Sequence, residues 1–297
     1  MKNFLKIIIV NILLILGIFL VYDWGLVAYN QYKPLPVDIN FALAPTYRFE
    51  SYLPYDEAKR PIVTMGCSFV YGEAINENET LAYKLQQYTN RKTYNYGTSA
   101  HGIQHVLYKL KNSPVFTPEL NPEYIVYVFI GDHLKRMYTN YFRLYDRAKY
   151  LKYAKAEGGG LKEDSFNVVL GDYFKVTYTG KKLNDFLYKI KPQDPQFDLF
   201  KLYLKEIKNT LNEKYPDTKF VIVVYNSEEN SRTVGLKPFH TNRWDELEDE
   251  GFIVINFDSL EYDFLNKQEF LAIDRQHPAP LVWDILVPII SKRLNLL

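Results

Sequence analysis

Five short runs of apolar residues recur along this 297-residue chain, and stretches with helical spacing separate most of them. The run at 123–130 (EYIVYVFI) is apolar at almost every position, which is typical of a strand that is buried on both faces. Strands that alternate with helices predict a mostly parallel sheet covered by helices on both sides. The expected strands are 61–65, 92–96, 123–130, 219–225 and 252–257.

Apolar residues at helical spacing connect these strands. In the stretch 196–214, for example, Phe197, Phe200 and Leu204 fall on one face. The less regular stretch from about 138 to 195 is rich in Tyr and Lys, and we expect it to be an insertion or a cap over the site. The sequence therefore predicts one α/β domain over 61–297. The expected helices are 79–90, 103–110, 196–214, 242–249 and 278–294.

The N-terminus carries a long apolar run that follows Lys2 and Lys6. Counted over 4–22, the run is just long enough to cross a hydrocarbon core of about 30 Å. Positive charge on its N-terminal side predicts a cytoplasmic N-terminus and an extracytoplasmic domain. We expect residues 1–25 to be an uncleaved membrane anchor, because 26–28 offers only a poor cleavage site; a cleaved signal peptide is the alternative. The proline-dotted segment 26–60 is expected to be an extended connector.

Composition excludes several functional classes. The formal net charge is only +1, so no overall field draws the protein toward nucleic acid, and we expect no nucleic-acid partner. The single cysteine, Cys67, excludes an intrachain disulfide and a zinc site built from paired cysteines. His101 and His105 have metal-ligand spacing, but no glutamate motif accompanies them, so we expect no metal site there. We also expect no cofactor. The basic pair 135–136 could meet an anionic substrate, but we expect it on a solvated face.

A candidate nucleophile follows the first expected strand, which ends in the residues MGCSF. In sheets of this kind, sites form at the C-terminal ends of the strands. Ser68 sits where the strand gives way to a loop, and a serine there is exposed at the top of the sheet with backbone N–H groups around it. Taken alone, the pattern is equally consistent with a serine that caps the following helix.

A candidate base lies near the C-terminus, where Asp274 precedes His277 by three residues. This spacing brings both side chains to one side of a turn. Pro278 favours an extended backbone at His277 and is expected to start the last helix directly after it. Asp274 could then hold one ring nitrogen and leave the other free as a base. The alternative is a surface aspartate and a loop histidine without a partner.

These motifs resemble the sequence blocks of the SGNH/GDSL hydrolase family. GCSFVYGE (66–73) is similar to the first block, and DRQH (274–277) is similar to the last. YNYG (94–97) resembles the second block, whose glycine N–H serves an oxyanion hole. The resemblance covers about 61–297 apart from the insertion. Together with the alternation of strands and helices, it implies a three-layer α/β/α sandwich whose five-stranded parallel sheet has the order 2-1-3-4-5.

Two departures from the family pattern stand out. The third block should be Gly-x-Asn-Asp, but this chain has GDHL at 131–134, so His133 aligns with the family asparagine. A neutral imidazole N–H can donate to an oxyanion as an amide does. Cys67 replaces the aspartate of Gly-Asp-Ser, which is not a catalytic member. The resemblance therefore implies an oxyanion hole made by the N–H groups of Ser68 and Gly97 together with His133.

The resemblance implies a serine-dependent ester hydrolase in which Ser68 attacks the ester, His277 takes the serine proton and Asp274 orients His277. With an outward-facing domain, we expect the substrate to be an O-acetylated glycan of the cell envelope or a secreted glycan. One alternative is an O-acyltransferase acting on the same class of substrate, because the same three side chains serve both reactions. Another is a non-catalytic glycan-binding or assembly protein, which the missing asparagine favours.

Overall fold

A computed structural model of the chain describes most of the expected domain. Most of the predicted anchor at 1–25, most of the connector at 26–60 and much of the insertion lie outside the described residues, so these assignments stay predictions. Within the described part of the chain, no helix combines the length and the apolar character needed to span a bilayer. The described residues are 53–99, 101–138, 153–157, 160–164, 194–225, 243–257, 260, 264 and 267–296, with positions 11, 14, 17, 18, 21 and 22.

Five parallel strands form the central sheet in the order β2-β1-β3-β6-β7. Counted among themselves they have the order 2-1-3-4-5, which confirms the predicted topology. The chain moves from β1 outward to β2 and then returns past β1 to β3. The direction of winding therefore changes between β1 and β3, and a crevice is expected beyond the C-terminal ends of these two strands. The strands are β1 (Ile62–Met65), β2 (Thr93–Asn95), β3 (Tyr124–Phe129), β6 (Lys219–Val224) and β7 (Ile253–Asn256).

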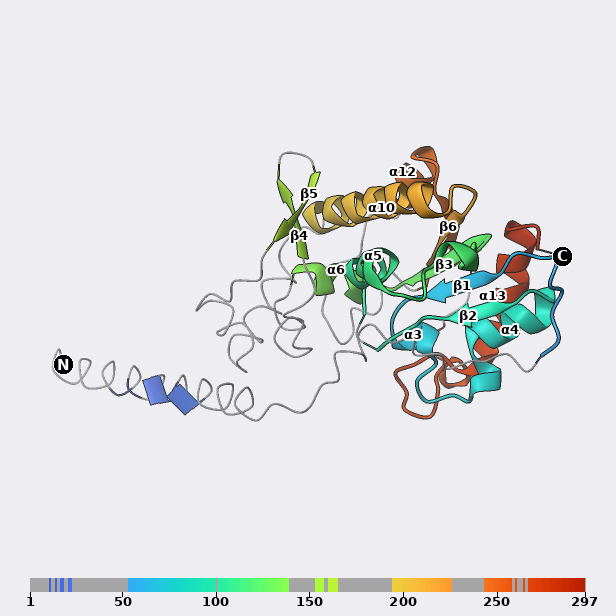
Figure 1. Cartoon of the computed structure of the whole chain (residues 1–297). Coiled ribbons are helices and arrows are strands. Elements are labelled where there is room, and N and C mark those ends of the chain that lie inside the picture. The colour runs from blue at the N-terminus through green and yellow to red at the C-terminus, as the bar shows by residue number, and fades with distance from the viewer. Residues whose placement is uncertain are drawn as a thin grey trace.

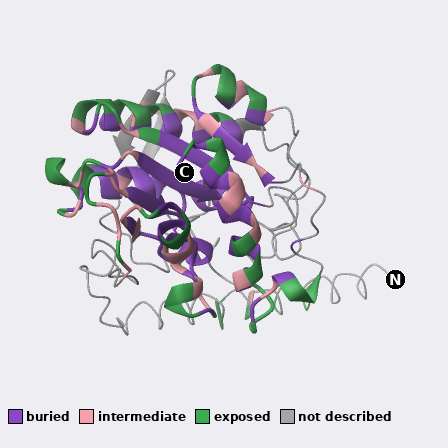
Figure 2. Cartoon of the chain, turned by 90° about the vertical axis from the view of Figure 1, so that its right-hand side faces the viewer, coloured by how far each residue is buried: buried purple, intermediate pink, exposed green. Residues whose placement is uncertain are grey.

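Helices cover both faces of the sheet, as predicted. Tyr127 and Phe129 pack in one core with α5, α10 and α12, whereas Val126 and Val128 pack in the other with α4 and α13. Figure 1 shows α10 and α12 on one side of the sheet and α4 and α13 on the other. Figure 2 shows the strands buried between helices that are exposed on their outer faces. The bounds are α4 (Leu81–Thr89), α5 (Ile103–Asn112), α10 (Asp194–Lys214), α12 (Arg243–Asp249) and α13 (Pro280–Arg293).

The structure adds elements that the sequence patterns did not predict. A one-turn helix, α3 (Ser68–Tyr71), directly follows β1, and α6 (Asp132–Tyr138) follows β3. Both are too short for apolar periodicity to reveal them. Within the expected insertion lies an antiparallel hairpin of β4 (Tyr153–Glu157) and β5 (Gly160–Asp164).

The last helix begins two residues later than predicted. Pro278 does not start it, because Pro278 forms an isolated antiparallel bridge with Leu271. The N–H of Ala279 donates to the carbonyl of Phe270 at 2.9 Å, which keeps the chain extended up to the N-cap. Pro280 then takes the first helical position, where its missing N–H costs nothing.

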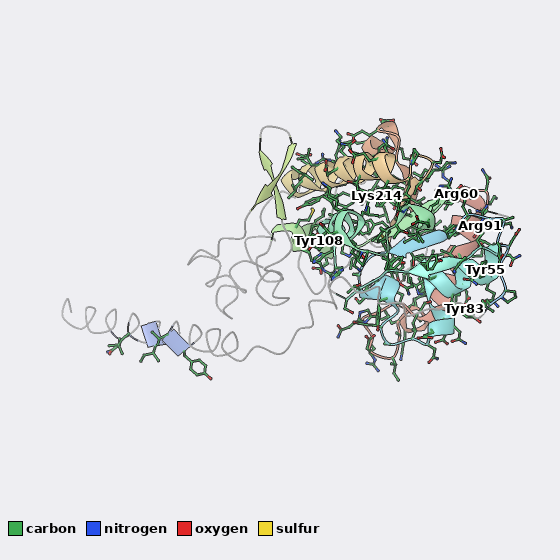
Figure 3. All side chains as sticks on the ribbon, viewed as in Figure 1. Tyr55, Arg60, Tyr83, Arg91, Tyr108 and Lys214 are labelled. Atoms are coloured by element: carbon green, nitrogen blue, oxygen red, sulfur yellow. The ribbon has the colours of Figure 1, made fainter. Side chains whose placement is uncertain are left out.

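Arginine side chains connect the N-terminal ends of neighbouring strands. Arg60, just before β1, donates to the backbone oxygen of Asn121 at 3.1 Å and to that of Pro122 at 2.7 Å. Arg91, before β2, pairs with Glu123. Arg60 and Arg91 lie close together in Figure 3. These contacts hold the strands together at their N-terminal ends, which lie opposite to the crevice.

Candidate active site

Ser68 is the first residue of α3, and the turn of Gly66 and Cys67 separates it from the end of β1. The first N–H groups of a helix have no acceptor within the helix, so the N–H of Ser68 is placed to meet an anionic oxygen. We expected a serine that stands open at the top of the sheet. Ser68 instead keeps only 7% of its surface exposed.

The structure brings Asp274 and His277 together in a tight loop. The N–H of Ala272 donates to the carbonyl of His277 at 2.8 Å, which closes the loop at its base. Oδ1 of Asp274 accepts the N–H groups of Gln276 at 3.0 Å and His277 at 3.1 Å, while Oδ2 bonds Nδ1 of His277. The expected pairing of the acid with one ring nitrogen is therefore present.

Asp274 is held in its ionised form. Partial burial would raise its pKa, but the hydrogen bonds from the His277 ring and from the backbone N–H groups of Gln276 and His277 outweigh burial, so the pKa of Asp274 lies below its usual value. A carboxylate with a lowered pKa stabilises the fold above about pH 4, and this stabilisation is lost as the pH falls through the folded-state pKa. At neutral pH, Asp274 is therefore an acceptor that can orient His277.

The second nitrogen of His277 contacts a residue to which we had assigned no role. Nε2 of His277 lies 3.1 Å from Oε2 of Glu73, and the other carboxylate oxygen of Glu73 accepts the hydroxyl of Ser99. The ring of Phe69 packs edge-on against His277, with centroids 5.4 Å apart. The structure thus places His277 against α3, and the partner that it gives for Nε2 is Glu73 instead of Ser68.

Gly97 allows the loop after β2 to lie directly on α3. A Cβ atom at position 97 would come within 2.3 Å of the backbone nitrogen of Tyr71. The side chain of Asn95 holds this contact, because its Nδ2 donates to the carbonyl of Val70 at 2.9 Å and its Oδ1 accepts the N–H of Gly97 at 3.0 Å. Gly97 would therefore have to exchange its bond to Asn95 in order to serve an oxyanion, and its predicted role as a donor stays a prediction.

His133 is fully buried between α6 and the sheet. Its Nδ1 lies 2.5 Å from the hydroxyl of Tyr127, and its ring packs edge-on against Phe129. Among the described residues, Nε2 has no hydrogen-bond partner. Burial, followed by the Arg136 guanidinium and His105, lowers the pKa of His133 well below its usual value, so the ring is neutral. Because no surface of His133 is exposed, its role as a third oxyanion donor also stays a prediction.

Arg136 does not lie on a solvated face, so that expectation was wrong. It lies on α6 against α5, where its Nε donates to Oδ2 of Asp132 at 2.6 Å and its Nη1 donates to the carbonyl of His101 at 2.7 Å. His101 and His105 stack with ring centroids 4.2 Å apart. Burial, more than the neighbouring cations, lowers the pKa of His105 to about 3. Across the described residues, no group of side chains is arranged to hold a metal ion.

Lys109 holds the loop that carries Gly97. From α5 its Nζ donates to the carbonyl of Tyr96 at 3.1 Å and to Oγ1 of Thr98 at 2.7 Å, so its two bonds bracket Gly97. Only 4% of Lys109 is exposed, and burial lowers its pKa to about 7. A costly buried amine is thus used to keep this loop against α3.

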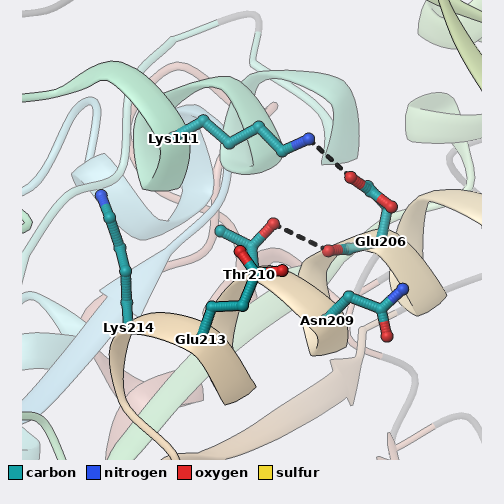
Figure 4. A pocket seen from close by; sticks show the side chains of 6 residues that line it. All are labelled: Lys111, Glu206, Asn209, Thr210, Glu213 and Lys214. Carbon is teal, nitrogen blue, oxygen red and sulfur yellow. Dashed lines mark hydrogen bonds and ion pairs between the residues drawn. The ribbon is translucent and has the colours of Figure 1, made fainter.

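A polar pocket between α5 and α10 lies apart from these residues (Figure 4). Lys111 pairs with Glu206 across it at 2.5 Å, and Lys214 donates to the carbonyl of Leu110. Because α5 runs back from the crevice, its C-terminal end lies toward the opposite edge of the sheet. We assign no function to this pocket. Its lining residues are Lys111, Glu206, Asn209, Thr210, Glu213 and Lys214.

Neither a family model nor a curated protein matches this sequence. Solved structures of lipolytic enzymes resemble it at low identity. One is a putative lipolytic protein of the G-D-S-L family from Desulfitobacterium hafniense DCB-2, with 11% identity, coverage of 79% of this chain and 99% of that chain, and a TM-score of 0.44. Another is the psychrotrophic esterase EstA from Pseudoalteromonas sp., with 11% identity, coverage of 80% and 97%, and a TM-score of 0.44. What the present site can do therefore has to follow from its own residues.

Replacing Gly97 by alanine should push the loop after β2 away from α3. We expect Gly97→Ala to lower the free energy of unfolding by about 1–3 kcal/mol, because the new methyl group meets rigid backbone. Chemical denaturation would measure the loss. Gly102→Ala is the matched control, since the methyl group there meets only the end of the Gln104 side chain and should cost less. Equal losses in the two variants would contradict the close contact.

The buried amine of Lys109 should make stability depend on pH. Between its folded-state pKa of about 7 and its ordinary value of 10.5, the unfolded chain binds more protons than the folded chain, so stability rises with pH. Relative to Lys109→Met, the wild-type protein should gain about 2 kcal/mol between pH 7 and pH 9 in denaturant titrations. Lys111→Met, on the same helix but more exposed, is the matched control. A difference that does not change with pH would mean that Lys109 titrates normally.

Proposed function

We propose that this protein is a serine-dependent hydrolase of carboxylic esters, with Ser68 as the nucleophile, His277 as the base and Asp274 as the orienting acid. The observation that carries the proposal is the Asp274–His277 pair, packed through Phe69 against the helix that begins with Ser68. An acid, an imidazole and a serine at a helix N-terminus are the parts that acyl transfer requires. They gather at the C-terminal edge of a parallel sheet, where catalytic sites of such folds form.

The reaction would proceed through an acyl-enzyme. Nε2 of His277 takes the proton of the Ser68 hydroxyl while Oγ attacks the ester carbonyl, and the N–H groups at the start of α3 stabilise the oxyanion. The imidazolium then gives its proton to the leaving alcohol. A water molecule, deprotonated by His277, releases the acid and restores Ser68. For this reaction to begin, the ring of His277 has to turn from Glu73 to Ser68.

We propose as substrate an O-acetyl group on a cell-envelope or secreted glycan. This part of the proposal depends on the apolar N-terminal run, which predicts that the domain lies outside the cytoplasm. An O-acyltransferase is the second candidate. The low exposure of Ser68 favours it, because transfer to a sugar hydroxyl requires that water be kept from the acyl-serine. Product analysis with and without an oligosaccharide acceptor distinguishes the two reactions.

The first test is the turnover of a small aryl acetate by the full-length protein in detergent. We expect measurable hydrolysis that Ser68→Ala lowers by a factor on the order of 10³ or more, because no other group replaces the nucleophile. Ser291→Ala is the matched control; it removes a buried hydroxyl on α13 and should leave turnover unchanged. Hydrolysis that survives in Ser68→Ala would exclude Ser68 as the nucleophile. If the wild-type protein shows neither hydrolysis nor transfer, a glycan-binding role is favoured.

Asp274→Asn should leave the loop closed but deprive His277 of its charged partner. Its amide oxygen can still accept the N–H groups of Gln276 and His277, while the ring is no longer held in the orientation and tautomer that a base needs. We expect turnover of the aryl acetate to fall by about 10³- to 10⁴-fold. Asp284→Asn, an exposed change on α13, serves as control. Similar turnover in the two variants would show that Asp274 has no part in the reaction.

A further inference from the structure

Glu73 joins three segments that meet at the candidate site. Helix α3 ends at Tyr71, and the left-handed backbone of its C-cap Gly72 (φ +83°) turns the chain so that the N–H of Glu73 donates to the carbonyl of Ser68 at 3.1 Å. The carboxylate accepts the hydroxyl of Ser99, on the loop after β2, through one oxygen. Its other oxygen lies 3.1 Å from Nε2 of His277. One residue therefore contacts the nucleophile through its backbone and the base through its side chain.

The ring of His277 lies between two carboxylates. Oδ2 of Asp274 bonds Nδ1 and Oε2 of Glu73 contacts Nε2. Ionised carboxylates only accept hydrogen bonds, so both contacts are hydrogen bonds at the same time only when both ring nitrogens carry a proton. These two carboxylates are the charged groups that the structure places against the ring, and Phe69 is its aromatic neighbour.

An imidazolium cannot take the proton of Ser68. In the proposed mechanism, Nε2 is the nitrogen that receives this proton, and it is also the nitrogen that Glu73 contacts. Glu73 and Ser68 therefore compete for one atom. The carboxylate of Glu73 has room to move away, because 39% of its side-chain surface is exposed.

We infer that Glu73 is a positioning residue that holds His277 in a resting, protonated state and has to release Nε2 before Ser68 can be activated. This inference rests on the roles proposed for Ser68 and His277. On release, the Nε2 proton passes to Oε2 of Glu73 and from there to solvent. The ring is then neutral, keeps its Nδ1 proton on Asp274 and can turn its free nitrogen toward Ser68.

A purely structural bridge would not need the charge of Glu73. In Glu73→Gln, the amide can still bond Ser99 and contact His277, but it no longer stabilises a charged ring. Glu73→Gln therefore distinguishes a role that needs the negative charge of Glu73 from one that needs only its hydrogen bonds between the loops. Glu77, exposed on the neighbouring 3₁₀ turn (Glu77–Glu79), allows removal of the same charge nearby without a contact to His277.

The test is the rate at which a fluorophosphonate labels Ser68 in the full-length protein between pH 5 and pH 9. We expect Glu73→Gln to be labelled about two- to fivefold faster than wild type at pH 5–6, as fits the strength of a partly exposed ion pair, and at the same rate near pH 9. Glu77→Gln should follow the wild-type profile. A Glu73→Gln profile that matches wild type, or that is slower at every pH, would overturn the inference.

A second measurement does not depend on catalytic activity. In protein labelled with ¹⁵N-histidine, both ring N–H protons of His277 should appear in the downfield proton spectrum at pH 6, with assignment by His277→Gln. Glu73→Gln should weaken the Nε2 signal and retain the Nδ1 signal. If Ser68 is never labelled but this change occurs, the proposed function fails and the contact of Glu73 with the imidazolium stands. If both signals are unchanged in Glu73→Gln, Glu73 does not hold the ring.

Discussion

The loop after β2 lies against α3 with no side chain between them, and the geometry of the site depends on this contact. Glycine at position 97 is what permits it, because a Cβ atom there would overlap the backbone at Tyr71. Asn95 then satisfies the carbonyl of Val70 and the N–H of Gly97. The two strand ends are thereby held at a separation that brings Ser99 to the carboxylate of Glu73. A looser junction would separate the groups that the chemistry needs together.

Buried cations support this junction from the α5 side of the sheet. Lys109 bonds both neighbours of Gly97, and Arg136 links α6 to the chain just before α5. Taking such groups out of water is costly, as the lowered pKa of Lys109 shows. In exchange for this cost, directed hydrogen bonds hold the loop around Gly97, which shape complementarity alone would hold less specifically. The His133 ring, bonded to Tyr127, belongs to the same buried layer.

The loop at 271–278, which carries Asp274 and His277, is held in a different way. A bridge between Leu271 and Pro278, together with the bond from Ala279 to Phe270, closes it before the last helix begins. Asp274 fills its interior with three hydrogen bonds, so the direction of the His277 ring depends on the loop and only secondarily on α3. Such a loop can present Nε2 of His277 to either of two partners, which are Ser68 at the start of α3 and Glu73 just beyond its end.

Local pattern by itself determined the five strands, their alternation with helices and the short distance between Asp274 and His277. Each of these depends on residues that are near one another in the chain, where periodicity and spacing carry the information. Together with the family resemblance, it also led to the sheet order. The contacts of Glu73 with Ser99 and His277, the burial of Arg136 and the bond between Asn95 and Val70 were decided only by the tertiary structure. They join segments that are distant in the sequence and are brought together by packing. The residue pattern within one segment does not predict which distant side chain will contact that segment.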